Sequence, residues 1–212
     1  MKEKSVIKYY VLCNHLKDIV RTGWKNWNIK RERVESVAEH IYGTQMLALA
    51  MWSEYKYDID IYKVILMLSI HELEEIIIGD FNPFEISREE KEELGHKAII
   101  KVLSPLIEKE ELKSIIFEFD EHKTKESLFA YQCDKLECDI QCKLYDEEGL
   151  VDFKDYELYG EKSIKDNLDF SKGWSYNWIN NDRQMVNYDE NFDIIAKYIL
   201  DNNIRNIGDD IK

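Results

Sequence analysis

Helix start signals recur along the whole chain, and they constrain its fold more than any other feature. Ser36-Val-Ala-Glu39 and Ser87-Arg-Glu-Glu90 both have the form of a capping box. In this motif the serine oxygen accepts a backbone N–H of the first helical turn, and the glutamate side chain bonds back to the serine. Further start signals lie at Asp60, Ser104-Pro105 and Thr124, and stop signals lie at Gly79 and Gly149. The chain therefore reads as a succession of helices.

The content of glycine and proline supports this interpretation. Eight Gly and two Pro are few for 212 residues, and a sandwich or barrel of many short strands needs more chain-breaking residues than this. Apolar periodicity predicts helices at 5–20, 36–54, 60–77, 87–103, 105–121, 124–147 and 188–203. We expect an all-α fold, with a helical core over residues 1–150. A C-terminal extension over 151–212 should pack on it, irregular through 187 and then forming one helix.

The charge balance limits the partners that such a chain can have. Forty-three acidic residues against 29 basic ones give a net charge of −14 and an isoelectric point of about 4.9, which repels nucleic acid polymers and anionic membranes. The sequence has no apolar run long enough to span a bilayer and no secretory signal at its start. Its four cysteines form no C-x-x-C pair. We expect a cytoplasmic protein that acts on a small molecule.

Ionisable residues lie on helix faces that should be buried. In the predicted helix 60–77, His71 and Glu75 continue an apolar face, and His40 and Asp134 occupy similar positions on two other predicted helices. A buried carboxylate costs several kcal/mol unless a positive charge compensates it. A shared divalent cation would compensate several such groups at once.

Taken singly, some of these residues have ordinary structural interpretations. Asp134 is equally compatible with an ion pair to a neighbouring Lys or Arg, and we assign Glu74 and Glu90 to a solvated face and a helix cap. The combination of His40, His71-Glu72 and Asp134 on separate helices favours a metal site, because metal sites in helical bundles draw ligands from facing helices.

Four stretches of the sequence, in a fixed order, carry a family resemblance. They are Arg21-Thr-Gly-Trp24, Glu35-Ser-Val-Ala-Glu-His40, His71-Glu-Leu-Glu-Glu75 followed by Gly79-Asp80, and Cys133-Asp-Lys-Leu-Glu137. In these stretches the chain resembles the HD-domain metal-dependent phosphohydrolases, and in particular the 5′-deoxynucleotidase branch. The resemblance covers most of residues 10–145.

The resemblance implies roles for particular residues. It implies metal ligands at His40, His71, Glu72 and Asp134, catalytic acids at Glu75 and Asp80, and substrate contacts at Arg21 and Trp24. It also implies a homodimer that hydrolyses nucleoside or deoxynucleoside 5′-monophosphates. Two imidazoles and two carboxylates suit one divalent transition metal (Mn²⁺, Co²⁺, Fe²⁺, Ni²⁺ or Zn²⁺) better than Mg²⁺ or Ca²⁺.

Residue 72 departs from the family pattern, because Glu stands where the family has Asp. The extra methylene shifts the carboxylate by roughly a bond length, whereas metal–oxygen distances tolerate only about 0.2 Å. Two alternatives therefore stay open: hydrolysis of another phosphorylated nucleotide, and a catalytically impaired nucleotide-binding or regulatory protein. A surface ion pair for Arg21 and a core position for Trp24 are the corresponding structural alternatives.

Overall fold

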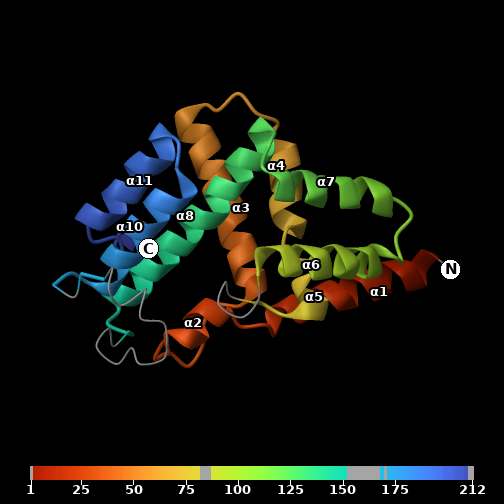
Figure 1. Cartoon of the computed structure of the whole chain (residues 1–212), viewed down its shortest axis with the longest axis horizontal. Coiled ribbons are helices and arrows are strands. Elements are labelled where there is room, and N and C mark those ends of the chain that lie inside the picture. The colour runs from red at the N-terminus through yellow and green to blue at the C-terminus, as the bar shows by residue number, and fades with distance from the viewer. Residues whose placement is uncertain (1, 82–86, 152–167, 170, 210–212) are drawn as a thin grey trace. The chain divides into compact units, whose positions relative to one another are not determined.

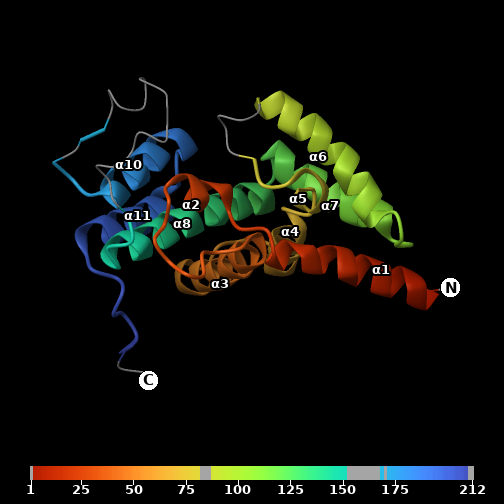
Figure 2. The same ribbon diagram turned by 90° about the horizontal axis from the view of Figure 1, so that it is seen from below.

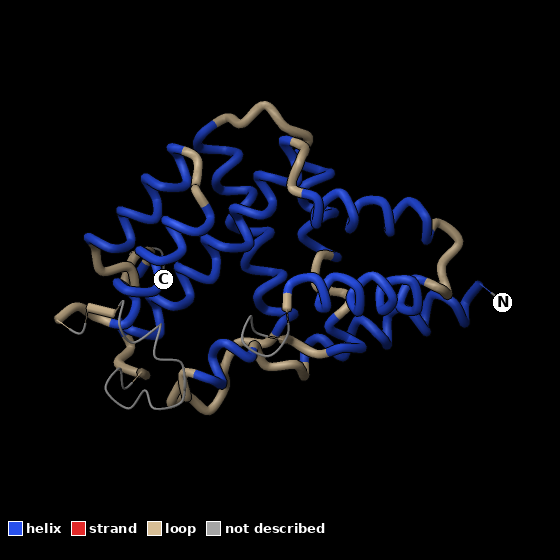
Figure 3. The backbone as a smooth tube through the Cα atoms, viewed as in Figure 1, coloured by secondary structure: helices blue, strands red, loops and turns tan. Residues whose placement is uncertain are grey.

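The computed structural model describes residues 2–81, 87–151, 168–169 and 171–209. These residues form helices joined by loops, and no β-strand is present among them (Figures 1 and 3). Val20 and Ser36 form an isolated antiparallel bridge. The all-α fold expected from the sequence is confirmed for this part of the chain.

The elements are α1 (Lys2–Asn14), the 3₁₀ helix η1 (His15–Lys17), α2 (Thr22–Asn26), α3 (Val37–Tyr55), α4 (Ile61–Ile70), α5 (Glu75–Ile78), α6 (Arg88–Leu103), α7 (Lys109–Glu121), α8 (Lys125–Glu147), α10 (Trp174–Val186) and α11 (Glu190–Asp201). None of the described helices is long and apolar enough to cross a membrane.

The chain divides into two compact units. The first contains Met1–Gly23 and Val34–Cys133, and the second contains Trp24–Arg33 and Asp134–Lys212. The boundaries fall inside α2 and α8, so both helices belong to both units. The sequence places its boundary after residue 150 instead, and that division stays a prediction.

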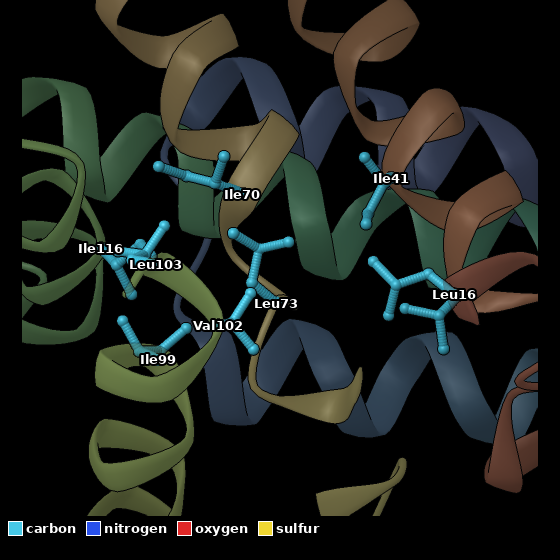
Figure 4. Close-up of a cluster of buried hydrophobic side chains, with 9 residues drawn as sticks. Leu16, Ile41, Ile70, Leu73, Ile99, Val102, Leu103 and Ile116 are labelled. Atoms are coloured by element: carbon cyan, nitrogen blue, oxygen red, sulfur yellow. The ribbon is translucent and has the colours of Figure 1, made fainter. Parts of the chain in front are cut away.

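The first unit is held together by an aliphatic core (Figure 4). Its buried members are Leu16, Val37, Ile41, Ile70, Leu73, Ile99, Val102, Leu103 and Ile116. They come from η1, α3, α4, α6, α7 and the turn after α4. Helix α3 packs against α4, and α6 packs against both α5 and α7 (Figure 2). This core fixes the positions of the segments that carry His40, His71 and Glu72.

The second unit has an aromatic core. The Trp24 ring centroid lies 5.4 Å from that of Tyr145, 6.2 Å from that of Trp174 and 5.4 Å from that of Trp178. Helix α10 begins at this cluster, where Asp146 accepts hydrogen bonds from the Ser175 backbone N–H (2.9 Å) and hydroxyl (2.6 Å).

The structure confirms most of the predicted helix ends. Both capping boxes are formed, at Ser36 with Glu39 and at Ser87 with Glu90. The Asp60 side chain accepts from two backbone N–H groups of α4. The Thr124 hydroxyl accepts from the Ser127 backbone N–H at 3.1 Å. Gly79 and Gly149 end their helices with positive φ, at 78° and 70°.

The structure differs from several expectations about helices. The helix predicted over 60–77 is interrupted at residues 71–74, and α7 begins at Lys109, not at Pro105. Ser104 ends α6, since its N–H bonds to the Lys101 carbonyl at 3.3 Å. Helices α2 and α10 were not predicted. Both lie in stretches rich in tryptophan and asparagine, residues with only a modest intrinsic preference for helices.

Candidate metal centre

His40 owes its position to the start of α3. The Ser36 backbone N–H donates to the Glu39 carboxylate at 2.9 Å, and the Ser36 hydroxyl accepts from the Glu39 N–H at 3.3 Å. The Arg21 N–H also donates to the Glu35 carbonyl at 3.0 Å. These bonds fix the first turn of α3, and with it His40, beside the segment that carries Arg21.

The turn after α4 positions the next two candidate ligands. Backbone hydrogen bonds join Leu73 N–H to the Ile70 carbonyl (3.2 Å) and Glu75 N–H to the Glu72 carbonyl (3.2 Å), a spacing tighter than that of an α-helix. His71 Nδ1 donates to the Leu68 carbonyl at 2.9 Å. This bond fixes the tautomer and presents Nε2 as a ligand atom.

Two histidines and one carboxylate come together in the first unit. Glu72 Oε1 lies 3.8 Å from His40 Nε2 and 3.7 Å from His71 Nε2. Both imidazoles are buried, whereas 12% of the Glu72 side chain is exposed. The potential ligand atoms of these three residues lie within 4.8 Å of one another.

These distances fit coordination of one ion. Two ligand atoms that each lie about 2.1 Å from a metal are separated by about 3.0 Å at a right angle and about 4.2 Å when opposite. The separations of 3.7 and 3.8 Å from Glu72 to the two imidazoles fall inside that interval. The longer Glu72 side chain therefore still reaches the space between the histidines.

Arg21 lies next to this group, and Asp80 is hydrogen-bonded to Thr22, which follows Arg21. Arg21 Nη1 is 3.4 Å from Glu72 Oε1. Asp80 binds the residue after Arg21, because its carboxylate accepts from the Thr22 N–H at 2.6 Å and its carbonyl accepts from the Thr22 hydroxyl at 2.5 Å. Asp80 therefore holds the start of α2, whatever part it has in chemistry.

Glu75 is buried on α5, with 1% of its side chain exposed. Neither of its carboxylate oxygens has a hydrogen-bond partner among the described residues, and the Lys91 ammonium of α6 lies 3.6 Å from Oε1. Burial raises the pKa of Glu75 well above its usual range, and the nearby carboxylates of Glu72 and Asp80 add to the rise. The raised pKa makes this carboxylate a stronger base than an ordinary glutamate, so the group is suited to accept a proton.

Lys91 was not predicted from the sequence, and Glu74 does not lie on the solvated face to which we assigned it. One carboxylate oxygen of Glu74 is buried without a hydrogen-bond partner among the described residues, so the residue is not part of a solvated face. Burial, followed by the charge of Glu72, raises the pKa of Glu74 to about 8. Gly95 of α6 permits this packing, since a Cβ there would lie 3.4 Å from Glu74 Cγ. A glycine inside a predicted helix was the available signal.

Two predicted site residues, Asp134 and Trp24, belong to the second unit. Asp134 follows Cys133 on the unbroken helix α8; it is 5% exposed and pairs with Lys135 at 2.8 Å. That pair is the ordinary alternative that the sequence left open. Trp24 is 2% exposed and packs in the aromatic core. The ligand role of Asp134 and the substrate contact of Trp24 stay predictions.

Comparisons with known proteins give a consistent result. Residues 13–172 match the sequence model of the HD domain. A 5′-deoxynucleotidase HDDC2 of Dictyostelium discoideum is 32% identical over 152 residues, which is 68% of this chain and 79% of that protein. A 5′-deoxynucleotidase, hdd1, of Schizosaccharomyces pombe is 29% identical over 182 residues, or 82% and 88% of the two chains.

Solved structures share the fold. A crystal structure from Magnetospirillum magnetotacticum, described as a predicted metal-dependent phosphohydrolase, superposes with a TM-score of 0.67 and 21% identity and covers 94% of each chain. A protein of Pyrococcus horikoshii superposes with a TM-score of 0.60 and 21% identity, covering 85% of this chain and 97% of its own.

Proposed function

The chain belongs to the HD domain family, and from this premise we propose that it is a metal-dependent phosphomonoesterase. Its proposed substrates are nucleoside 5′-monophosphates, with the deoxynucleotides as the first choice because the relatives from D. discoideum and S. pombe are named 5′-deoxynucleotidases. The observation that carries the proposal is the distance of Glu72 Oε1 from the two imidazoles, 3.8 and 3.7 Å.

The proposed metal ligands are His40, His71, Glu72 and Asp134. This set of two nitrogens and two carboxylates suits a divalent transition metal, such as Mn²⁺, Co²⁺, Fe²⁺, Ni²⁺ or Zn²⁺. When bound, the ion would supply an activated water and would polarise a phosphate oxygen. Asp134 has a second carboxylate oxygen besides the one that faces Lys135, so the ion pair and the ligand role are compatible.

The remaining site residues handle phosphate and protons. In the reaction the water oxygen bonds to phosphorus, the bond from phosphorus to O5′ breaks, and the leaving oxygen takes up a proton. Arg21 offers a planar pair of N–H donors for the phosphate. Glu75, buried and with a raised pKa, takes the proton from the attacking water. Asp80 is proposed to contact the substrate as well as hold Thr22.

The proposal extends to the state of the protein. We propose a homodimer, on the family resemblance, and a cytoplasmic location. The four cysteines all lie among the described residues and none of them forms a disulfide, which is compatible with a reducing compartment. The partner implied is a small nucleotide, with no nucleic acid polymer and no membrane, in keeping with the net charge of −14.

The test is phosphate release from a panel of nucleoside 5′-monophosphates. Metal-stripped protein is assayed with Mn²⁺, Co²⁺, Ni²⁺, Zn²⁺ and Mg²⁺ in turn. The Asp134→Asn variant, which lacks one of the proposed ligands, is assayed in the same way. We expect a transition metal to restore release in the wild type and not in the variant. Bound metal without release would favour another phosphate substrate or a nucleotide sensor. Equal release by the variant would remove Asp134 from the metal site.

A further inference from the structure

Lys91 brings a positive charge into the acidic site from α6. Its Nζ lies 3.6 Å from Glu75 Oε1, and one-third of its side chain is exposed. Burial alone would lower the pKa of Lys91, but the charges of Glu72, Glu75, Glu74 and Asp80 together raise it above its usual value. The side chain therefore remains an ammonium at the pH of any assay near neutrality.

The contact between Lys91 and Glu75 is close without being a hydrogen bond. At 3.6 Å the two atoms lie beyond the range of about 2.7–3.2 Å for an N–H···O bond. Both oxygens of the buried Glu75 lack a hydrogen-bond partner among the described residues. The three N–H donors of the ammonium are thus not engaged by the carboxylate beside them, and they are available to another oxygen.

The charges around Glu75 indicate which kind of ligand would supply the oxygen that accepts a hydrogen bond from Lys91. Glu72, Glu74, Glu75 and Asp80 all act on Lys91 through their charges, and the whole chain carries −14. A phosphate dianion that enters such a site requires local positive charge. Arg21 provides part of it, but Arg21 already lies 3.4 Å from the Glu72 carboxylate. Lys91, a compact charge on a flexible stem, can provide the rest.

We propose that Lys91 is a second phosphate-binding cation of this site, donating from Nζ to a non-bridging oxygen of the substrate and then of the phosphate product. The inference rests on the proposed phosphomonoesterase function. It gives helix α6 a role in phosphate binding. The sequence around Lys91 does not indicate this role.

The test measures binding of inorganic phosphate to Mn²⁺-loaded protein by calorimetry, together with product inhibition by phosphate. Lys91→Met should weaken phosphate binding about tenfold to a hundredfold, since it removes a charged hydrogen bond to an anion. Lys91→Arg should restore most of the affinity. Lys97→Met is the matched control, because Lys97 lies on the same helix, is 61% exposed and pairs with Glu93.

Manganese content and melting temperature are measured for every variant, so that loss of metal or of folding is recognised; Lys91→Gln is the substitute if the methionine variant is poorly folded. Unchanged phosphate affinity in Lys91→Met, with a shifted pH profile of kcat, would overturn the proposal and make Lys91 a positioning residue for Glu75. A wild-type protein that releases phosphate normally while Lys91→Met keeps its phosphate affinity would overturn this inference alone. A wild-type protein that neither binds nor releases phosphate would overturn the proposed function with it.

Discussion

Replacing Glu72 by glutamine tests directly whether this carboxylate is a metal ligand. The substitution keeps the shape of the side chain and removes its charge. In the structure Glu72 Oε1 lies 3.7–3.8 Å from both imidazoles and 3.4 Å from Arg21. We expect the variant to bind metal more weakly than the wild type. We expect the metal-free variant to be at least as stable as the metal-free wild type, because Glu72 repels the carboxylates of Glu74 and Glu75.

The size of the effect follows from linkage. Substitution of a residue that is only hydrogen-bonded to a metal ligand lowers metal affinity about tenfold to a hundredfold. Loss of an anionic ligand itself should therefore lower metal affinity at least about a hundredfold. At a metal concentration about 100 times the wild-type Kd, the wild type gains about 2.7 kcal/mol of stability. The variant gains only about 0.4 kcal/mol at the same concentration. For a chain of this size the difference corresponds to about 5–9 °C in Tm.

The assay is thermal unfolding of the metal-stripped protein at increasing Mn²⁺, with Kd measured separately by calorimetry. Glu93→Gln is the matched control, since Glu93 is an exposed glutamate of α6 paired with Lys97. If Glu72→Gln shows the same rise in Tm and the same Kd as the wild type, Glu72 does not bind the metal. The geometric argument from its distances to the two histidines would then be refuted.

Three further predictions concern neighbouring residues. Glu75→Gln should leave metal affinity within about threefold and lower kcat by about a hundredfold or more, and steady-state kinetics with unchanged activity would exclude Glu75 from proton transfer. The pKa of Glu74 is raised to about 8 in the native protein, against about 4.5 in the unfolded chain. Between these two values the native state keeps a proton that the unfolded state has lost, so the stability of the metal-free protein falls as pH rises from about 4.5 to about 8. Glu74→Gln should therefore raise Tm at pH 8.5 and not at pH 5, and parallel pH curves for the two proteins would contradict this. Ser36→Ala should lower stability by about 1 kcal/mol, or about 2–4 °C in Tm, through loss of the α3 capping box; circular dichroism melts measure it, and no change would mean that the cap is not needed.

The sequence by itself determined where most helices begin and which residues were candidates for the metal site. The starts at Ser36, Ser87 and Asp60 depend on side chains that bond to a backbone group two or three residues away, so they can be read without knowing the fold. The positions of His40 and His71 on buried faces follow from the helical period, which is also local.

Only the tertiary structure decided which of these residues meet. Arg21 and Glu72 are 51 residues apart in sequence and 3.4 Å apart in space, and Lys91 reaches Glu75 from a different helix. The interruption after Ile70 also escaped the sequence, because apolar residues continue with a helical period while the backbone bonds tighten to three-residue spacing. Such features depend on how helices pack against the core, and a pattern within a single helix carries no information about the helix that it packs against.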